Sequence, residues 1–181
     1  MTSVNRWVSF IYFKQAVWLV VLILTFQSCG VYSFKDVSIP PEIKTIRIGF
    51  IENRARYVNP VLSPLLTDKF KQKIASQTKL VQVQSDNADY DVTAYVADYA
   101  VSTAGVSNQS ASINRLTVTI HMALKNRLND QKLGTPDFET DITRNYDFPS
   151  SQTLNEAEAS RIQEISDQMT DDMFNRLFSN W

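Results

Sequence analysis

Residues 114–128 read NRLTVTIHMALKNRL and alternate between apolar and polar side chains over most of their length. The apolar positions are Leu116, Val118, Ile120, Met122 and Leu124, and the positions between them are Arg115, Thr117, Thr119, His121, Ala123 and Lys125. Successive side chains of a β-strand point to opposite faces of its sheet. The period of two therefore predicts a long strand with one face in the core and one polar face.

Four other segments on either side of this one are predicted strands. Ile43–Ile51 alternates, with Ile46, Ile48 and Phe50 on the face expected to be buried. Residues 80–84 form a short strand, 91–102 a long one, and 138–148 a strand with less regular alternation. We expect 91–102 and 114–128 to form a hairpin whose long loop is Thr103–Ile113, a stretch rich in Ser, Ala, Asn and Gly.

Two amphipathic helices are predicted, each with its own start signal. Asn59-Pro60 supplies an N-cap and a proline at the first helical position, and Thr153 with Glu156 matches a capping box. The apolar stripes are Leu62, Leu65, Leu66, Phe70 and Ile74 in the first helix and Ile162, Ile165, Met169, Met173 and Leu177 in the second. The expected fold class is α+β, a two-layer sandwich of a mixed four- or five-stranded sheet with two long helices on one face.

The N-terminal segment has the composition of a secretory leader. Arg6 and Lys14 are its only charges before Lys35, and the 11-residue run 16–26 (AVWLVVLILTF) is too short to span a bilayer but suits the apolar region of a signal peptide. An uncleaved membrane anchor is the alternative, because 7–26 is mostly apolar. Lys14 and Gln15 in its middle disfavour that reading.

Cys29 is the only cysteine and follows the apolar run directly. Its position resembles a lipobox, in which the thiol carries diacylglycerol, the amine of the cleaved chain takes an acyl group, and these chains hold the protein at a membrane. The predicted organisation is a lipoprotein signal peptide at 1–28, a lipidated Cys and tether at 29–42, and a single domain at 43–181. Without residues 1–28 the chain keeps 16 of its 18 basic and all 19 acidic residues, a net charge of −3 that does not favour nucleic acid.

The sequence has few of the residues and motifs that catalysis usually requires. With one histidine, His121, and one cysteine, neither a histidine-based triad nor a Cys/His metal site can be assembled, and no phosphate-binding glycine loop occurs. We expect no enzyme activity, no metal and no cofactor beyond the lipid on Cys29. Asp86, Asp89 and Asp91 lack the spacing of a calcium loop and are interpreted as turn residues.

Basic residues are the candidate binding groups. Arg and Lys recognise phosphates, which lipopolysaccharide carries on its lipid A part, although surface cations occur on any soluble domain. The candidates for contact with lipopolysaccharide or a partner are Arg54, Arg56, Arg115, Lys125 and Arg127.

Several short motifs, taken in order along the mature chain, resemble the LptE-type lipopolysaccharide-assembly lipoproteins, in a divergent branch of that family. They are Cys29-Gly30-Val31-Tyr32-Ser33-Phe34, Lys44-Thr45-Ile46, Asn53-Arg54-Ala55 with Asn59-Pro60, Asn114-Arg115-Leu116-Thr117-Val118, and Asp171-Asp172-Met173-Phe174-Asn175 with Trp181. The resemblance implies an outer-membrane lipoprotein, anchored at the periplasmic leaflet, that partners the large β-barrel LptD as plug and assembly factor. It also implies support for insertion of lipopolysaccharide into the outer leaflet, and two helices against a mixed sheet.

A lipid-anchored periplasmic binding module for another envelope ligand, such as a peptidoglycan fragment or an efflux component, is the alternative function. A pocket lined by aromatic side chains would favour that module. A solid core with a polar exterior would favour the barrel partner.

Overall fold

The computed structural model describes residues 39–107 and 110–178. The predicted signal peptide, Cys29, most of the tether and Trp181 lie outside the described residues. In the described part, no helix is both long and apolar enough to cross a bilayer.

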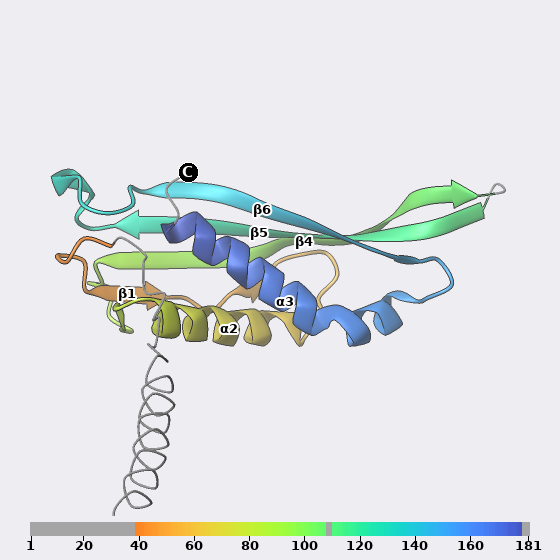
Figure 1. Cartoon of the computed structure of the whole chain (residues 1–181), viewed down its shortest axis with the longest axis horizontal. Coiled ribbons are helices and arrows are strands. Elements are labelled where there is room, and N and C mark those ends of the chain that lie inside the picture. Colours follow the sequence, from red (N-terminus) through yellow and green to blue (C-terminus); the bar gives the residue numbers. More distant parts are fainter. Residues whose placement is uncertain (1–38, 108–109, 179–181) are drawn as a thin grey trace, which may run out of the picture. The chain divides into compact units, whose positions relative to one another are not determined.

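The domain has six strands and two long helices (Figure 1). In chain order they are β1 (Thr45–Ile48), β2 (Glu52–Asn53), α2 (Leu62–Gln77), β3 (Val81–Gln82), β4 (Tyr90–Ser107), β5 (Ser110–Asn126), the 3-10 turn η2 (Asn129–Gln131), β6 (Phe138–Pro149) and α3 (Leu154–Phe178). The predicted α+β fold with a mixed sheet is confirmed. The strand number is higher than expected because β2, with two residues, is too short to show a periodic pattern, whereas β3 lies within the strand predicted at 80–84.

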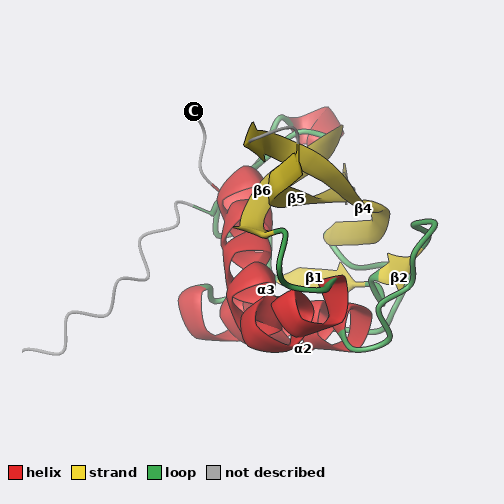
Figure 2. Cartoon of the chain, turned by 90° about the vertical axis from the view of Figure 1, so that its right-hand side faces the viewer, coloured by secondary structure: helices red, strands yellow, loops and turns green. Residues whose placement is uncertain are grey.

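The sheet has the order β3-β1-β4-β5-β6, with β2 also paired to β4. β1 is parallel to β3 and to β4, as expected for a strand–helix–strand crossover through α2. β4, β5 and β6 are antiparallel neighbours over most of their length. Both helices lie on the same side of the strands (Figure 2), so one sheet face is covered and the other is open.

The core lies between the helices and the covered face. The predicted apolar set of β5 is at most 3% exposed at every position. From the helices, Phe70, Ile74, Met169 and Met173 are fully buried against it. The period of two in β5 therefore does select its buried face.

The start signal of α3 acts as predicted, whereas Pro60 lies outside α2, whose N-cap position is Val61 rather than Asn59. Asn59 Oδ1 accepts hydrogen bonds from the N–H groups of Val61 and Leu62, at 2.9 and 3.3 Å. Thr153 and Glu156 form the reciprocal capping box, with Thr153 N donating to Glu156 Oε2 at 2.8 Å and Glu156 N donating to Thr153 Oγ1 at 3.4 Å. These backbone and hydroxyl hydrogen bonds lower the pKa of Glu156.

The predicted long hairpin loop is wrong. Pairing of β4 with β5 continues to Ser107 and Ser110, with irregular register between Thr103 and Val106. Small and polar residues have weak strand propensity, but a strand propagates outward along an established partner. The composition of residues 103–113 therefore did not indicate that the β4–β5 pairing extends this far.

The predicted burial of Phe50 is also wrong, since its side chain is 59% exposed. β1 ends at Ile48, and Gly49 N donates to Val92 O at 3.0 Å. Ile51 is buried instead, and its N–H donates to Thr67 Oγ1 of α2 at 3.0 Å. The alternation thus shifts by one residue where the strand ends.

Acidic residues of α3 connect the helical layer to its neighbours. Lys69 and Lys73 of α2 form ion pairs with Asp167 and Asp171, the latter at 2.7 Å. Asp172 pairs with Arg144 of β6. Asp171 and Asp172 therefore each have a specific partner, on α2 and on β6.

Candidate functional site

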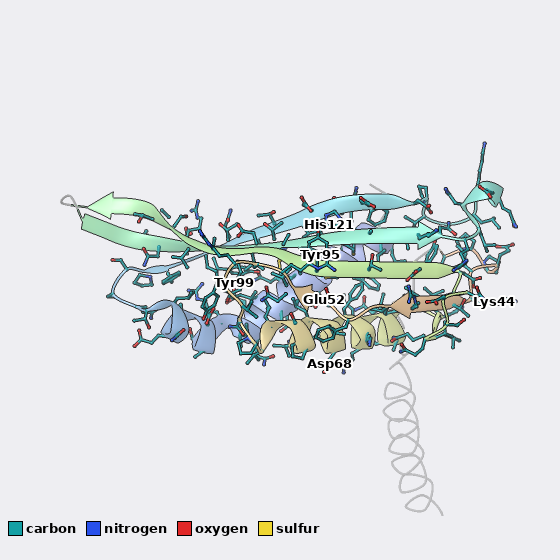
Figure 3. All side chains as sticks on the ribbon, turned by 180° about the vertical axis from the view of Figure 1, so that it is seen from behind. Lys44, Glu52, Asp68, Tyr95, Tyr99 and His121 are labelled. Atoms are coloured by element: carbon teal, nitrogen blue, oxygen red, sulfur yellow. The ribbon has the colours of Figure 1, made fainter. Side chains whose placement is uncertain are left out.

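The open face of the sheet is the candidate site, because it extends over the three longest strands and no described helix covers it (Figure 3). On β5 it carries the predicted polar set from Arg115 to Lys125. Antiparallel register places β6 residues opposite them, pairing 115 with 147, 117 with 145, 119 with 143, 121 with 141 and 123 with 139. Residues paired in this way share a face, so the site is a two-strand polar ladder flanked by β4.

Side chains along this ladder bond to one another. Arg115 binds Asp147 through two hydrogen bonds, at 2.6 and 2.8 Å. The hydrogen bond and the charge of Asp147 raise the pKa of Arg115, and Arg115 in turn lowers the pKa of Asp147. The ladder is therefore fixed in place and nearly neutral at this end.

Three further rungs continue this pattern. Thr117 Oγ1 lies 2.9 Å from Asn145 Oδ1, and the hydroxyls of Thr119 and Thr143 lie 2.9 Å apart. His121 Nδ1 lies 2.7 Å from Asp141 Oδ1. The middle of the face thus presents polar groups that already have partners.

An aromatic and cationic stack crosses the middle of the open face (Figure 3). The rings of Tyr95, on β4, and His121 are stacked with centroids 4.9 Å apart. The guanidinium carbon of Arg54 lies 4.3 Å above the Tyr95 ring, and Glu52 holds that guanidinium by two hydrogen bonds at 2.8 and 3.0 Å. Stacking of this kind restricts the side chains to a flat arrangement.

Toward the β1 edge the open face becomes ionic. Arg47 binds both carboxylate oxygens of Asp91, at 2.7 and 2.8 Å, and reaches Asp86 at 2.8 Å. Asp91 raises the pKa of Arg47 by hydrogen bonding and charge. Asp89 Oδ2 accepts hydrogen bonds from the N–H groups of Lys44 and Thr45 and from the Thr45 hydroxyl. The aspartates interpreted as turn residues therefore also join β1 to β4.

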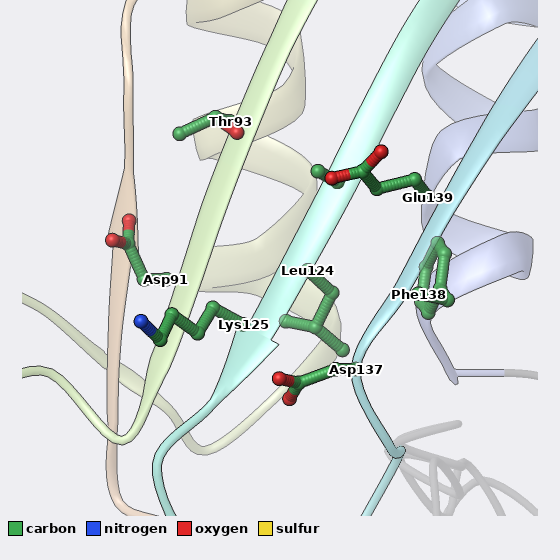
Figure 4. Close-up of a pocket in the computed structure, with 8 residues that line it drawn as sticks. Asp91, Thr93, Leu124, Lys125, Asp137, Phe138 and Glu139 are labelled. Carbon is green, nitrogen blue, oxygen red and sulfur yellow. The ribbon is translucent and has the colours of Figure 1, made fainter.

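A hollow of about 480 Å³ lies at this end of the open face (Figure 4). Its charged lining consists of Asp91, Asp137 and Glu139 with a single cation, Lys125. Three carboxylates around one ammonium disfavour a phosphate ligand here.

The five predicted binding residues do not form one cluster. Arg54, Arg115 and Lys125 lie on the open face, but Arg115 and Lys125 are ten positions apart on one strand, about 33 Å. Arg56 is exposed in the loop before α2, and Arg127 donates to the backbone oxygen of Asp86 in the turn after β5. Arg54 and Arg115 are already paired with carboxylates.

Sequence reasoning missed Arg47, Tyr95 and the β6 partners of the ladder. The acidic and amide positions of β6, which recur at 139, 141, 145 and 147, were visible in the sequence. Their period of two, set against the basic and hydroxyl period of β5, is the signal that could have identified them.

A partly buried polar cluster joins Tyr57 and Tyr99 to Glu158 of α3. The hydroxyl of Tyr57 donates to Glu158 at 3.2 Å, and its ring stacks on Tyr99 with centroids 5.7 Å apart. Burial, together with the nearby charge of Glu158, raises the pKa of Tyr99, and burial with the Glu158 charge raises the pKa of Tyr57. Both phenols stay protonated at neutral pH, so neither serves as a base. Among the described residues, no group of three or more His, Cys, Asp and Glu could hold a metal ion.

A model of a protein family matches most of the chain. The family model LptE, described as lipopolysaccharide-assembly, matches residues 43–177. No match was found among curated protein sequences.

Solved structures of bacterial lipoproteins also match, at low identity. Rare lipoprotein B from Shewanella oneidensis is 12% identical, with 72% of this chain and 92% of that chain covered and a TM-score of 0.48. Lipoprotein B from Nitrosomonas europaea is 13% identical, with 73% and 81% covered and a TM-score of 0.43. A minor lipoprotein from Acinetobacter baumannii is 17% identical, with 75% and 97% covered and a TM-score of 0.38. Because these TM-scores are below 0.5, the assignment of the chain to a family rests on the match to the family model.

Proposed function

The chain belongs to the LptE family of lipopolysaccharide-assembly proteins, and from that premise we propose that it is an outer-membrane lipoprotein partnering an LptD-type β-barrel. A role in lipopolysaccharide assembly follows from the family. In the proposal, acyl chains on Cys29 anchor the protein at the periplasmic leaflet, and the domain acts as plug and assembly factor for the barrel. The proposal assigns it no catalytic activity and no cofactor apart from that lipid.

The open polar face is the observation that best supports a barrel partner. The interior of a large membrane barrel is polar, so a body that fills it needs a polar and shape-stable surface. The Arg115–Asp147 pair and the Thr119–Thr143 pair hold the face in one conformation before contact. Little side-chain entropy is then lost when the face meets the barrel wall.

The five basic candidate residues are assigned to lipopolysaccharide binding on the basis of their charge alone. Arg54, Arg115, Lys125 and Arg127 each have a carboxylate, a carbonyl or an acidic hollow nearby. Among the described residues, Arg56 has no ion-pair partner. We therefore rank Arg56 first among the five for phosphate contact, and an Arg56→Gln variant should weaken lipopolysaccharide binding more than Arg115→Gln does.

Affinity purification of the tagged protein from solubilised outer membranes tests the barrel partnership. The expected result is a large β-barrel protein recovered near one-to-one, identified by mass spectrometry. Absence of any such barrel, with the protein present in that membrane, would contradict the proposal.

Two variants test whether the open face is the surface that contacts the barrel. Thr119→Arg places a long charged side chain in the middle of the ladder and should reduce recovery of the barrel severalfold. Gln163→Arg makes the same charge change at an exposed position of α3 and should reduce it less. Equal recovery with both variants would contradict the open face as the principal contact, and circular dichroism would verify that both fold.

The alternative of a binding module for another envelope ligand has less support. The described hollows are lined mainly by polar and aliphatic side chains, with Phe138 the single aromatic among their lining residues. An aromatic-lined pocket was the feature that would have favoured such a module.

A further inference from the structure

A second surface, distinct from the open face, lies where the tether enters the domain. A hollow of about 460 Å³ there is lined by apolar side chains and flanked by two lysines. The lining residues are Ile39, Pro40, Pro41, Ile43, Lys44, Thr78, Lys79, Leu80 and Val81. Val81, on the edge strand β3, is 61% exposed, which makes it one of the most exposed large apolar side chains among the described residues.

The backbone holds these residues together. Val81 N donates to Lys44 O at 2.8 Å, so the exposed valine lies beside the first lysine, which directly precedes β1. Ile43 N donates to Pro40 O at 3.0 Å, which turns the entering chain against the same hollow. Lys44 and Lys79 are both exposed, and neither forms a salt bridge within the described residues.

An apolar patch flanked by unpaired lysines has the chemistry of a membrane-contacting surface. Apolar side chains enter the boundary between headgroups and acyl chains, and each nearby lysine gains from anionic headgroups. The length of chain before the patch agrees with this. Nine residues lie between Cys29 and Ile39, and the ten steps from one to the other reach at most about 36 Å when fully extended.

We propose that the surface formed by Ile39, Pro41, Val81, Lys44 and Lys79 docks onto an anionic phospholipid membrane. The inference rests on the lipid anchor of the proposed function, and it adds an orientation that a tether alone would not impose. Because anchoring keeps the patch close to the bilayer, a weak surface contact suffices to hold it there. β1 and its parallel neighbour β4 then lead away from the membrane, and the β4–β5 hairpin points toward the partner.

Lipid-mediated quenching of a single fluorophore tests this orientation. The acylated protein is reconstituted in phosphatidylethanolamine vesicles with or without phosphatidylglycerol, both containing nitroxide-labelled lipid. Because acylation occupies Cys29, the substitution Val81→Cys provides the one free thiol for labelling. Val101→Cys is the matched control, since Val101 is an exposed valine on the distal part of β4, 42% accessible.

With phosphatidylglycerol present, we expect strong quenching at position 81 and little quenching at position 101. Replacing both lysines, Lys44→Gln with Lys79→Gln, should lower the ratio of docked to undocked protein about tenfold, and high salt should act in the same direction. Equal quenching at the two positions would overturn the proposal. So would quenching at 81 that persists without anionic lipid and without the two lysines, because the anchor and tether alone would then hold the patch near the bilayer.

The barrel partnership does not enter this measurement. Failure to recover a barrel would leave the quenching pattern unchanged, whereas a failed quenching pattern would leave barrel recovery unchanged. The two proposals therefore fail separately.

Discussion

The two faces of the sheet are made by alternate residues of the same strands. One face contributes mainly to stability, and the other is the candidate binding surface. On β5, Val118 and Ile120 are fully buried beneath the helices, while Thr119 between them belongs to a polar ladder on the open face. The covered face excludes water, and its stability comes from apolar burial. The open face is held by short-range polar pairs that water could replace at small cost. Stability and recognition can therefore be altered separately in this domain.

The largest expected effect is in the covered face. Phe70→Ala removes a fully buried ring of α2 and should lower the free energy of unfolding by about 3–5 kcal/mol, measured by urea denaturation. Tyr95→Ala on the open face is the matched aromatic truncation and should cost far less, because Tyr95 is only partly buried. Similar losses of unfolding free energy for the two variants would contradict the expected difference in stability contribution between the two faces.

A smaller effect is expected where the β5–β6 connection closes over the core. Gly134 has a φ of +71°, and a Cβ there would collide with Ile43 Cδ1 and the Tyr90 hydroxyl. Gly134→Ala should therefore cost about 1–3 kcal/mol. Gly49→Ala is the control, since the nearest atom to its Cβ would be Val92 O at 3.6 Å. A neutral Gly134→Ala variant would show that the connection moves independently of the core.

Asp89 sharpens the comparison, because it is a polar group whose role is structural. Burial raises the pKa of Asp89, but hydrogen bonds from the N–H groups of Lys44 and Thr45 and from the Thr45 hydroxyl outweigh burial, and the pKa falls below its usual 3.8. The ionised form is therefore favoured by folding. Its contribution is present above the unfolded pKa and is lost as pH falls through the folded pKa.

Asp89→Asn should consequently cost about 1 kcal/mol at neutral pH and make unfolding less dependent on pH below about pH 4. The measurement is urea denaturation across pH 2–7, with Asp68→Asn, an exposed aspartate of α2, as control. An unchanged acid dependence in Asp89→Asn would contradict the assigned role.

The smallest effect is expected in the middle of the open face. Thr119→Ala removes one hydroxyl contact of 2.9 Å with Thr143 and should change stability by about 0.5 kcal/mol or less. Thermal unfolding of both single variants and of the double variant with Thr143→Ala checks this value. A coupling well above 1 kcal/mol would mean that the ladder contributes to stability as much as to recognition.

The candidate site was only partly predictable. Alternation along β5 identified Arg115 and Lys125 as residues of the polar face. It could not show that Asp147 neutralises Arg115, because that partner is 32 positions away and depends on strand register. Arg47 was missed for the same reason, since Asp91 reaches it only across the parallel β1–β4 pair.

Local interactions explain what the sequence by itself determined. The period of two in β5, the apolar stripes of both helices, the hydrogen bonds to Asn59 and the Thr153–Glu156 capping box all involve residues close in sequence, so the elements and their buried sides were predictable. Only the tertiary structure decided how far the β4–β5 ladder extends, where the alternation shifts after Gly49, and which charges are paired. Those outcomes depend on register and on packing between distant segments, and no single segment encodes them.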